Sequence, residues 1–382
     1  MLIPQSSPRI ALKAPFLSIW LSLSVITDCV VHPYVYPREA VPNDTLRIIA
    51  LGTGVPSIFK SQAATSYLLQ LGSNERNILF DVGTGSIANL YATRVSLSTI
   101  DKVFISHAHS DHITDLAPLY ALANGRPGPL QVWGPSGASE ATGIAAIVEG
   151  LRQFLAWDQE ARNKVMGREK GQPQNAIIAH QFDHNVTNQV IYEQDGIRIT
   201  STPVFHYATP GPVALRLDWN NISITFSGDT IPLQSFLDLG SGSDVVLHET
   251  VGPRNSFHLQ DPTTRNILLN HTSQSEVGAI FQKLQPRLAI ATHLSINEYS
   301  IVPILSGIRS TYPTGPLAIA QDFAVWDVSP SAVSQRKFVP VTTSAGYEFA
   351  NPCPAQHDLE VDDDGDWPRA AVACCAAAMT GA

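Results

Sequence analysis

A short polar loop places three histidines and one aspartate within six positions, from His107 to His112. The loop follows an apolar run and precedes a stretch of helical character. In an extended chain, residues two positions apart project to the same side, so His107 and His109 can bind one metal ion together. Asp111 and His112 lie where the chain turns into the helix and can face a second ion. Imidazole and carboxylate groups are the expected ligands of zinc, so this spacing predicts a metal site rather than a set of surface histidines.

The loop and the motifs around it resemble those of the metallo-β-lactamase superfamily, whose signature is HxHxDH. The resemblance runs over most of residues 46–328 and is greatest to the branch of tRNase Z-like and arylsulfatase-like hydrolases. The matching motifs, in chain order, are Leu51-Gly52-Thr53-Gly54, Phe80-Asp81-Val82-Gly83-Thr84-Gly85, the histidine loop, His206, Ser227-Gly228-Asp229-Thr230, His248-Glu249-Thr250 and Ala291-Thr292-His293. Each later motif is weak alone, but their order and their places at strand ends make the set specific.

The resemblance implies two divalent metal ions, with zinc expected and manganese or iron as alternatives. Two sets of side chains would hold them, with Asp229 as the bridge: His107, His109 and His206 in one set, and Asp111, His112 and His293 in the other. Metal ions in such sites lie ~3.5–4 Å apart and lower the pKa of a shared water to about 7. This chemistry predicts hydrolysis, by attack of the water on a carbonyl, phosphorus or sulfur centre.

The three ligands outside the loop also have ordinary structural interpretations. His206 and His293 each follow an apolar run, where a lone histidine is usually a hydrogen-bonded residue near the core. Asp229 follows Gly228 and could belong to a plain turn. Because the histidine loop is present, metal binding is the favoured interpretation for all three.

Two further pairs of residues are expected near the metals. In the tRNase Z branch, a motif similar to His248-Glu249-Thr250 supplies a proton donor, so Asp111, His248 and Glu249 are the predicted catalytic residues. A structural role for the His248–Glu249 pair is the alternative. Asp81 and His271 are predicted to orient the ligands through hydrogen bonds, since such contacts fix histidine tautomers.

Apolar strand-like runs alternate with helical stretches along the middle of the chain. Strands are predicted at 46–51, 65–71, 77–80, 103–105, 196–205, 212–219, 222–226, 245–247 and 288–292. Helices are predicted at 86–91, 113–123, 138–156 and 273–284. This mixture predicts an α/β fold, a four-layer αβ/βα sandwich of two mixed sheets flanked by helices, which is the metallo-β-lactamase fold.

Three zones are expected: a leader over residues 1–45, a hydrolase domain over 46–328 with a helical insertion at about 138–170, and a tail over 329–382. The tail is acidic and rich in proline and alanine, so we expect it to be disordered. Arg9 and Lys13 precede an apolar run over residues 14–31, which resembles a secretory signal or anchor. A secreted, periplasmic or membrane-anchored protein is therefore one expectation, and a cytoplasmic protein with an N-terminal extension is the other.

The substrate is predicted from charge and from what the insertion lacks. The net charge is −9, which disfavours nucleic acid as a partner. The insertion mixes acidic and basic residues and has no long Gly- and Lys/Arg-rich arm, and Lys60-Ser61-Gln62-Ala63 lacks the Arg-Asn element of the tRNase Z branch. We therefore expect a small ester of sulfate, phosphate or a carboxylic acid.

Three alternatives remain: a tRNA 3′-processing endonuclease, a non-catalytic binding protein on the same scaffold, and an iron protein with a redox role. The insertion itself carries apolar residues that suit a lid or the surface of a homodimer: Leu151, Phe154, Leu155 and Trp157.

Overall fold

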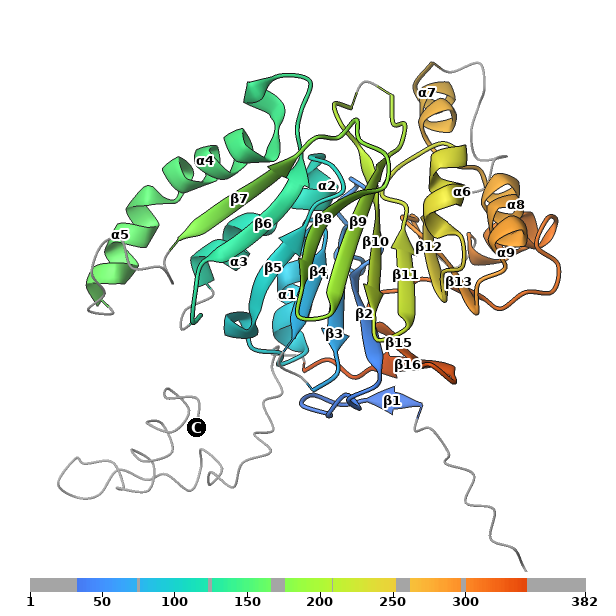
Figure 1. Ribbon diagram of the computed structural model, residues 1–382, viewed down its shortest axis with the longest axis horizontal. Helices are drawn as coiled ribbons and strands as arrows, with labels where there is room; N and C mark the ends of the chain where they lie inside the picture. Colours follow the sequence, from blue (N-terminus) through green and yellow to red (C-terminus); the bar gives the residue numbers. More distant parts are fainter. Residues whose placement is uncertain are drawn as a thin grey trace, which may run out of the picture. The chain divides into compact units, whose positions relative to one another are not determined.

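The computed structural model describes residues 33–73, 76–122, 126–165, 176–207, 209–251, 262–296 and 300–341. These residues form two mixed β-sheets that share one apolar core, with helices on the outer face of each sheet (Figure 1). The predicted α/β sandwich is thereby confirmed.

The first sheet has nine strands in the order β1-β16-β15-β2-β3-β4-β5-β6-β7. They are β1 (Tyr34–Val35), β2 (Leu46–Gly52), β3 (Ser66–Leu71), β4 (Asn77–Phe80), β5 (Ile100–Phe104), β6 (Leu130–Pro135), β7 (Ile177–Phe182), β15 (Ala324–Val328) and β16 (Val333–Phe338). The strands predicted at 65–71 and 77–80 form the antiparallel pair β3–β4, and β4 to β7 are parallel.

The second sheet has seven strands in the order β14-β13-β12-β11-β10-β9-β8. They are β8 (Gln189–Gln194), β9 (Ile197–Pro203), β10 (Val213–Trp219), β11 (Ile222–Phe226), β12 (Val245–Glu249), β13 (Leu288–Thr292) and β14 (Leu317–Ile319). The strands predicted at 196–205, 212–219 and 222–226 form the antiparallel meander β9–β10–β11, and β11 to β14 are parallel.

Strands buried on both faces explain the apolar runs of the sequence. In β2, Leu46, Ile48 and Ala50 belong to the core between the two sheets, whereas Ile49 and Leu51 belong to the core under the helices. Successive side chains of a strand point to opposite faces, so a strand covered on both sides is apolar throughout.

Helices cover each sheet from outside. On the first sheet these are α1 (Ser86–Ala92), α3 (Leu116–Leu122) and α4 (Ile144–Phe154), and on the second α6 (Gln234–Gly240), α8 (Gln274–Leu284) and α9 (Ile301–Arg309). The remaining helical elements are η1 (Leu97–Thr99), α2 (Ser110–Ile113), η2 (Glu140–Thr142), α5 (Ala156–Val165) and α7 (Pro262–Asn270). The helix predicted at 113–123 corresponds to α3, and the short helix α2 precedes it. The helix predicted at 138–156 corresponds to the 3₁₀ turn η2 followed by α4.

The folded unit extends beyond the boundaries predicted for the hydrolase domain. β1 precedes residue 46, and β16 lies in the segment predicted to be a disordered tail. β16 has a polar sequence, but its Arg336 forms ion pairs with Glu39 at 2.6 Å and with Asp327 at 3.0 Å. Ion pairs therefore stabilise β16 in the first sheet, a strand that the pattern of apolar residues did not reveal. Residues 1–32 of the predicted leader and 342–382 of the predicted tail lie outside the described residues.

The helical insertion lies against the first sheet. Ile144 and Val148 of α4 are buried against it, while Phe154 and Trp157 are exposed. In Figure 1, α4 runs along β6 and β7, and α5 lies far from α2, where the histidine loop ends. This placement does not support a lid formed by α5, and the homodimer surface stays a prediction.

Among the helices of the described residues, none combines the length and apolar character that crossing a membrane requires. The apolar run over residues 14–31 lies outside the described residues.

Candidate metal centre

The predicted ligands all follow the carboxyl ends of strands. The histidine loop follows β5, His206 follows β9, Asp229 follows β11 and His293 follows β13. In the second sheet, β9, β11 and β13 run in the same direction, so their carboxyl ends lie at the same edge of that sheet. Residues distant in sequence therefore converge where the edges of the two sheets adjoin, which is where α/β folds commonly bind ligands.

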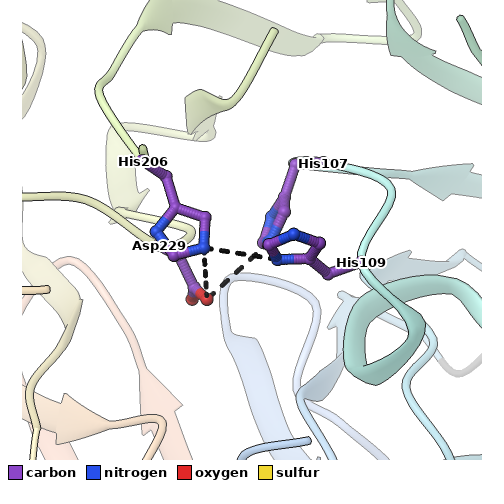
Figure 2. Close-up of side chains that lie close together, drawn as sticks. All are labelled: His107, His109, His206 and Asp229. Carbon is purple, nitrogen blue, oxygen red and sulfur yellow. Dashed lines mark hydrogen bonds and ion pairs between the residues drawn. The ribbon is translucent and has the colours of Figure 1, made fainter. Parts of the chain in front are cut away.

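The first set of donor atoms comes from three histidines and one aspartate. His109 Nδ1 lies 3.1 Å from His107 Nε2 and 3.3 Å from His206 Nε2. Asp229 Oδ2 lies 3.8 Å from His107 Nε2 and 3.9 Å from His206 Nε2. Figure 2 shows the four side chains pointing toward one another, and one ion could contact all four.

The second set shares the same aspartate. His293 Nε2 lies 3.1 Å from Asp111 Oδ2 and 3.3 Å from Asp229 Oδ2, and His112 Nε2 lies 3.3 Å from Asp229 Oδ1. These four residues form a second group that could hold an ion. Asp229 belongs to both groups, which is the arrangement expected of a bridging carboxylate.

Hydrogen bonds fix which nitrogen of His112 and of His206 faces the cluster. His112 donates from Nδ1 to Asp81 Oδ2 at 2.7 Å, and Asp81 also accepts from the Ser106 backbone and hydroxyl, each at 2.7 Å. His206 donates from Nδ1 to the Asn270 carbonyl at 3.1 Å. Each ring therefore turns its Nε2 lone pair inward, as metal ligands require. Asp81 was predicted to orient a ligand through a hydrogen bond, and its contact with His112 is a hydrogen bond of this kind.

Sequence reasoning did not identify Thr209 and Asn270 as neighbours of the ligands. The Thr209 hydroxyl lies 3.2 Å from His109 Nε2, on the ring edge opposite the cluster. Asn270 contributes a backbone carbonyl, and a backbone contact leaves no signal in the residue type. Its position next to His271 was the one available hint.

Several buried polar atoms of the site have no hydrogen bond in the part of the chain that the structure describes, although two of them, His112 Nε2 and Asp229 Oδ1, lie 3.3 Å apart. Within the described residues, Asp111 Oδ1, His112 Nε2 and Asp229 Oδ1 are buried without a hydrogen bond. Such atoms cost free energy unless something satisfies them. All three belong to the second donor set, and a divalent cation fits them because it accepts lone pairs from nitrogen and oxygen together.

The electrostatics agree with a site built for cations. Burial raises the pKa of Asp229, but the nearby His293 and His112 outweigh it and hold that pKa well below its ordinary value. Burial lowers the pKa of His107 well below its ordinary value, and the charge of His112 adds to the effect. An ionised Asp229 and a neutral His107 are in the protonation states in which they can act as ligands. Burial lowers the pKa of His112, but Asp229 and Asp81 outweigh it and raise that pKa well above its ordinary value, so His112 must release a proton when a metal ion binds.

Two glycines let the backbone approach the site closely. A Cβ on Gly83 would lie 2.0 Å from the Asp111 carbonyl oxygen, and one on Gly228, whose φ is 56°, would lie 2.9 Å from the Ser106 Cβ. Neither position has room for a side chain, so glycine lets the turn at residues 83–85 and the segment after β11 pack directly against the histidine loop.

His248 does not lie among the donor atoms. Its ring is fully buried beside Phe236, with 4.7 Å between ring centroids, and its Nδ1 donates to the Glu249 carbonyl at 2.7 Å. Its ring lies among the aromatic side chains of the helix-covered core, so the structure adds no support to the predicted proton-donor role, which stays a prediction.

His271, predicted only as a supporting residue, lies beside the donor sets instead. Its ring centroid is 4.8 Å from that of His206 and 5.4 Å from that of His293. Glu249 Oε1 is 3.0 Å from its Nδ1. Burial lowers the pKa of His271, but the charge of Glu249 and this hydrogen bond outweigh it and raise that pKa to about 9. The side chain of Glu249 therefore pairs with His271, and not with His248 as the sequence suggested.

Comparisons with known proteins agree with this geometry. The sequence profile of the metallo-beta-lactamase superfamily matches residues 62–276, which is more than half of the chain. The chain is 25% identical to the ribonuclease Z of Mycobacterium marinum over 262 residues, covering 65% of this chain and 86% of that protein. It is also 25% identical to the ribonuclease Z of Mycobacterium tuberculosis over 258 residues, covering 65% and 85%.

Solved structures share the fold at low sequence identity. The metallo-beta-lactamase fold protein YhfI from Bacillus subtilis aligns with a TM-score of 0.57 and 19% identity, over 75% of this chain and 100% of that one. The short form of human tRNase Z aligns with a TM-score of 0.50 and 17% identity, over 73% and 98%.

Proposed function

Because this chain belongs to the metallo-beta-lactamase superfamily and is a metal-dependent hydrolase, we propose that it hydrolyses a small anionic ester of phosphate or sulfate. Two divalent cations, with zinc expected ahead of manganese or iron, would be bound by His107, His109, Asp111, His112, His206, Asp229 and His293. The observation that carries the proposal is the pair of donor sets that share Asp229.

The charge of the site favours an anionic substrate over a neutral one. Asp111 and Asp229 are the two carboxylates among the seven proposed ligands, whereas two divalent cations bring twice as many positive charges. The surplus positive charge attracts a phosphate or sulfate ester more strongly than a carboxylic ester. When bound, the cations supply an activated water and stabilise negative charge on the group under attack.

The chain's own residues would then handle the protons. Asp111 Oδ1 has no hydrogen-bond partner among the described residues and can accept the proton that the attacking water gives up. His271 is held by Glu249, and its ring lies beside His206 and His293. A protonated His271 can therefore donate to the leaving oxygen, the task that the sequence assigned to His248.

Helices α4 and α5 of the insertion offer little electrostatic attraction to the phosphates of RNA. Each basic residue of α4 and α5 is paired with an acidic neighbour: Arg152 with Glu149 at 3.0 Å, Arg162 with Asp158 at 2.7 Å and Lys164 with Glu160 at 3.4 Å. A surface whose charges are balanced in this way releases few counterions from a phosphate backbone. This observation supports a small substrate.

Cleavage of RNA is the second candidate. It is favoured by the ribonuclease Z relatives, which this chain matches over most of their length. The two functions differ in substrate size and in salt dependence, because binding that depends on phosphate contacts weakens steeply as salt increases.

The test combines metal analysis with a panel of substrates. Purified chain loaded with zinc or manganese would be assayed on an aryl sulfate, an aryl phosphodiester, a carboxylic ester, a lactone, a β-lactam and a precursor tRNA at low and high salt. We expect turnover of the sulfate ester or phosphodiester and none of the precursor tRNA. Specific tRNA cleavage at low salt would favour the second candidate, and turnover of the carboxylic ester alone would refute the charge argument.

A further inference from the structure

The backbone at His293 has a conformation that needs support from its neighbours. Its φ is 56°, a left-handed value that residues with a side chain adopt at a cost. The residue stands directly after β13, and its Nε2 faces Asp111 and Asp229. The direction in which this ligand points therefore depends on whatever holds the chain on either side of it.

Gln62 makes the main side-chain contacts to the segment after His293. Its amide nitrogen donates to the Leu294 carbonyl at 2.7 Å, and its amide oxygen accepts from the Ile296 backbone N–H at 3.2 Å. One half-buried side chain thus bonds to both ends of a three-residue turn. Gln62 stands in the segment that departs from the Arg-Asn element of the tRNase Z branch, and the proposed function gives it no role.

A second layer of contacts fixes Gln62. Its amide nitrogen also lies 3.1 Å from the Thr53 hydroxyl, which donates to Asp322 Oδ1 at 2.9 Å. The Thr53 carbonyl in turn accepts from the Leu294 backbone N–H at 3.0 Å. Asp322 Oδ2 accepts from the Ala63 backbone N–H at 2.7 Å. The turn after β13 is therefore joined to the loop after β2 by a closed set of hydrogen bonds.

We infer that Gln62 is a positioning residue that holds His293 in the geometry needed for the second donor set. The inference rests on the proposed function, since it concerns one of the two proposed metal ions. Gln62 hydrogen-bonds to none of the first donor set, whose histidines follow β5 and β9. Loss of its amide should therefore weaken one metal ion and leave the other in place.

The test measures the affinity of each metal ion by competition with a chromophoric chelator. Gln62→Met keeps the length of the side chain and removes its hydrogen bonds to Leu294, Ile296 and Thr53. Gln62→Glu keeps an acceptor for Ile296 but sets a carboxylate against the Leu294 carbonyl. Gln70→Met is the matched control, because Gln70 is also a hydrogen-bonded glutamine, bound to Asn77 at 3.0 Å at the other end of β3.

We expect the wild-type chain to bind two zinc ions, and both Gln62 variants to bind one of them about 10- to 100-fold more weakly with the other unchanged. Gln70→Met should keep both affinities even if its melting temperature falls. Wild-type affinity for both ions in Gln62→Met, or an equal loss of both, would overturn the inference while the proposed function stands. A wild-type chain that binds no pair of ions would overturn the proposed function and the inference together.

Discussion

Replacing Asp81 with asparagine changes one buried acceptor without changing the size of the side chain. Asp81 Oδ2 accepts hydrogen bonds from His112 Nδ1 and from the Ser106 hydroxyl, each at 2.7 Å. In Asp81→Asn, the side-chain NH₂ must take the place of one of the two carboxylate oxygens. It then faces either the His112 ring and the Ser106 hydroxyl, or the Ser106 backbone N–H. Either choice leaves at least one buried donor without an acceptor, and a donating amide would reverse the tautomer of His112.

The reversed tautomer would place a proton on His112 Nε2, the atom that lies 3.3 Å from Asp229 Oδ1. A protonated nitrogen cannot bind a metal ion. Loss of such an orienting contact typically costs 10- to 100-fold in metal affinity, or about 1.4–2.8 kcal/mol. The unmet hydrogen bonds should also lower stability by about 1–3 kcal/mol, which is several degrees in melting temperature for a domain of this size.

The assay is zinc affinity by competition, with melting temperature measured on the same samples. The control is Asp115→Asn, because Asp115 is a half-buried aspartate nearby in the chain, and its side chain accepts from the Ile87 backbone N–H at 2.9 Å rather than from a proposed ligand. We expect both variants to lose stability and only Asp81→Asn to lose zinc. Wild-type zinc affinity in a folded Asp81→Asn would refute the reasoning.

Three other changes test separate parts of the account. His271→Ala should lower kcat by about 10²–10⁴-fold while both metal ions stay bound, and an unchanged kcat in a metal-loaded sample would exclude it as the proton donor. Gly83→Ala should abolish activity and lower the melting temperature, because its Cβ would lie 2.0 Å from the Asp111 carbonyl, and normal activity would contradict this close packing. Burial raises the pKa of Glu39, but Arg336 and Arg47 outweigh it and hold that pKa below its ordinary value. The stability that Glu39 adds is therefore present above pH about 4.5 and lost as the pH falls further, so Glu39→Gln should melt below the wild type at pH 7 and close to it at pH 3; an equal difference at both values would count against the pairing.

The candidate ligands could be predicted because their signal is local. The spacing from His107 to His112 is visible without any knowledge of the fold, and His206, Asp229 and His293 each stand at the end of an apolar run. Parallel strands end at one edge, so the convergence follows from chain direction alone.

The choice between His248 and His271 could not be made from the sequence. His248 and Glu249 are neighbours on β12 and point to opposite faces. A half-exposed strand would reveal which face is which through alternation of apolar and polar residues, but every residue of β12 is buried. The sequence therefore did not show which residues of β12 face the cluster and which face the helices. Only the tertiary structure places His271 next to Glu249.

Strands that depend on polar contacts were missed for a related reason. β16 contains Gln335, Arg336 and Lys337, and β6 ends in Gly134 and Pro135, which are typical of turns. β16 is held in place by the ion pairs of Arg336 with Asp327, on the neighbouring strand β15, and with Glu39, which lies 297 positions earlier in the chain. Local periodicity carries no record of such contacts.

Anomalous diffraction from crystals of the zinc-loaded chain tests the central claim most directly. The account predicts two peaks ~3.5–4 Å apart, one among His107, His109 and His206, the other among Asp111, His112 and His293, and both next to Asp229. Peaks elsewhere, or no peak at the carboxyl ends of these strands, would contradict it.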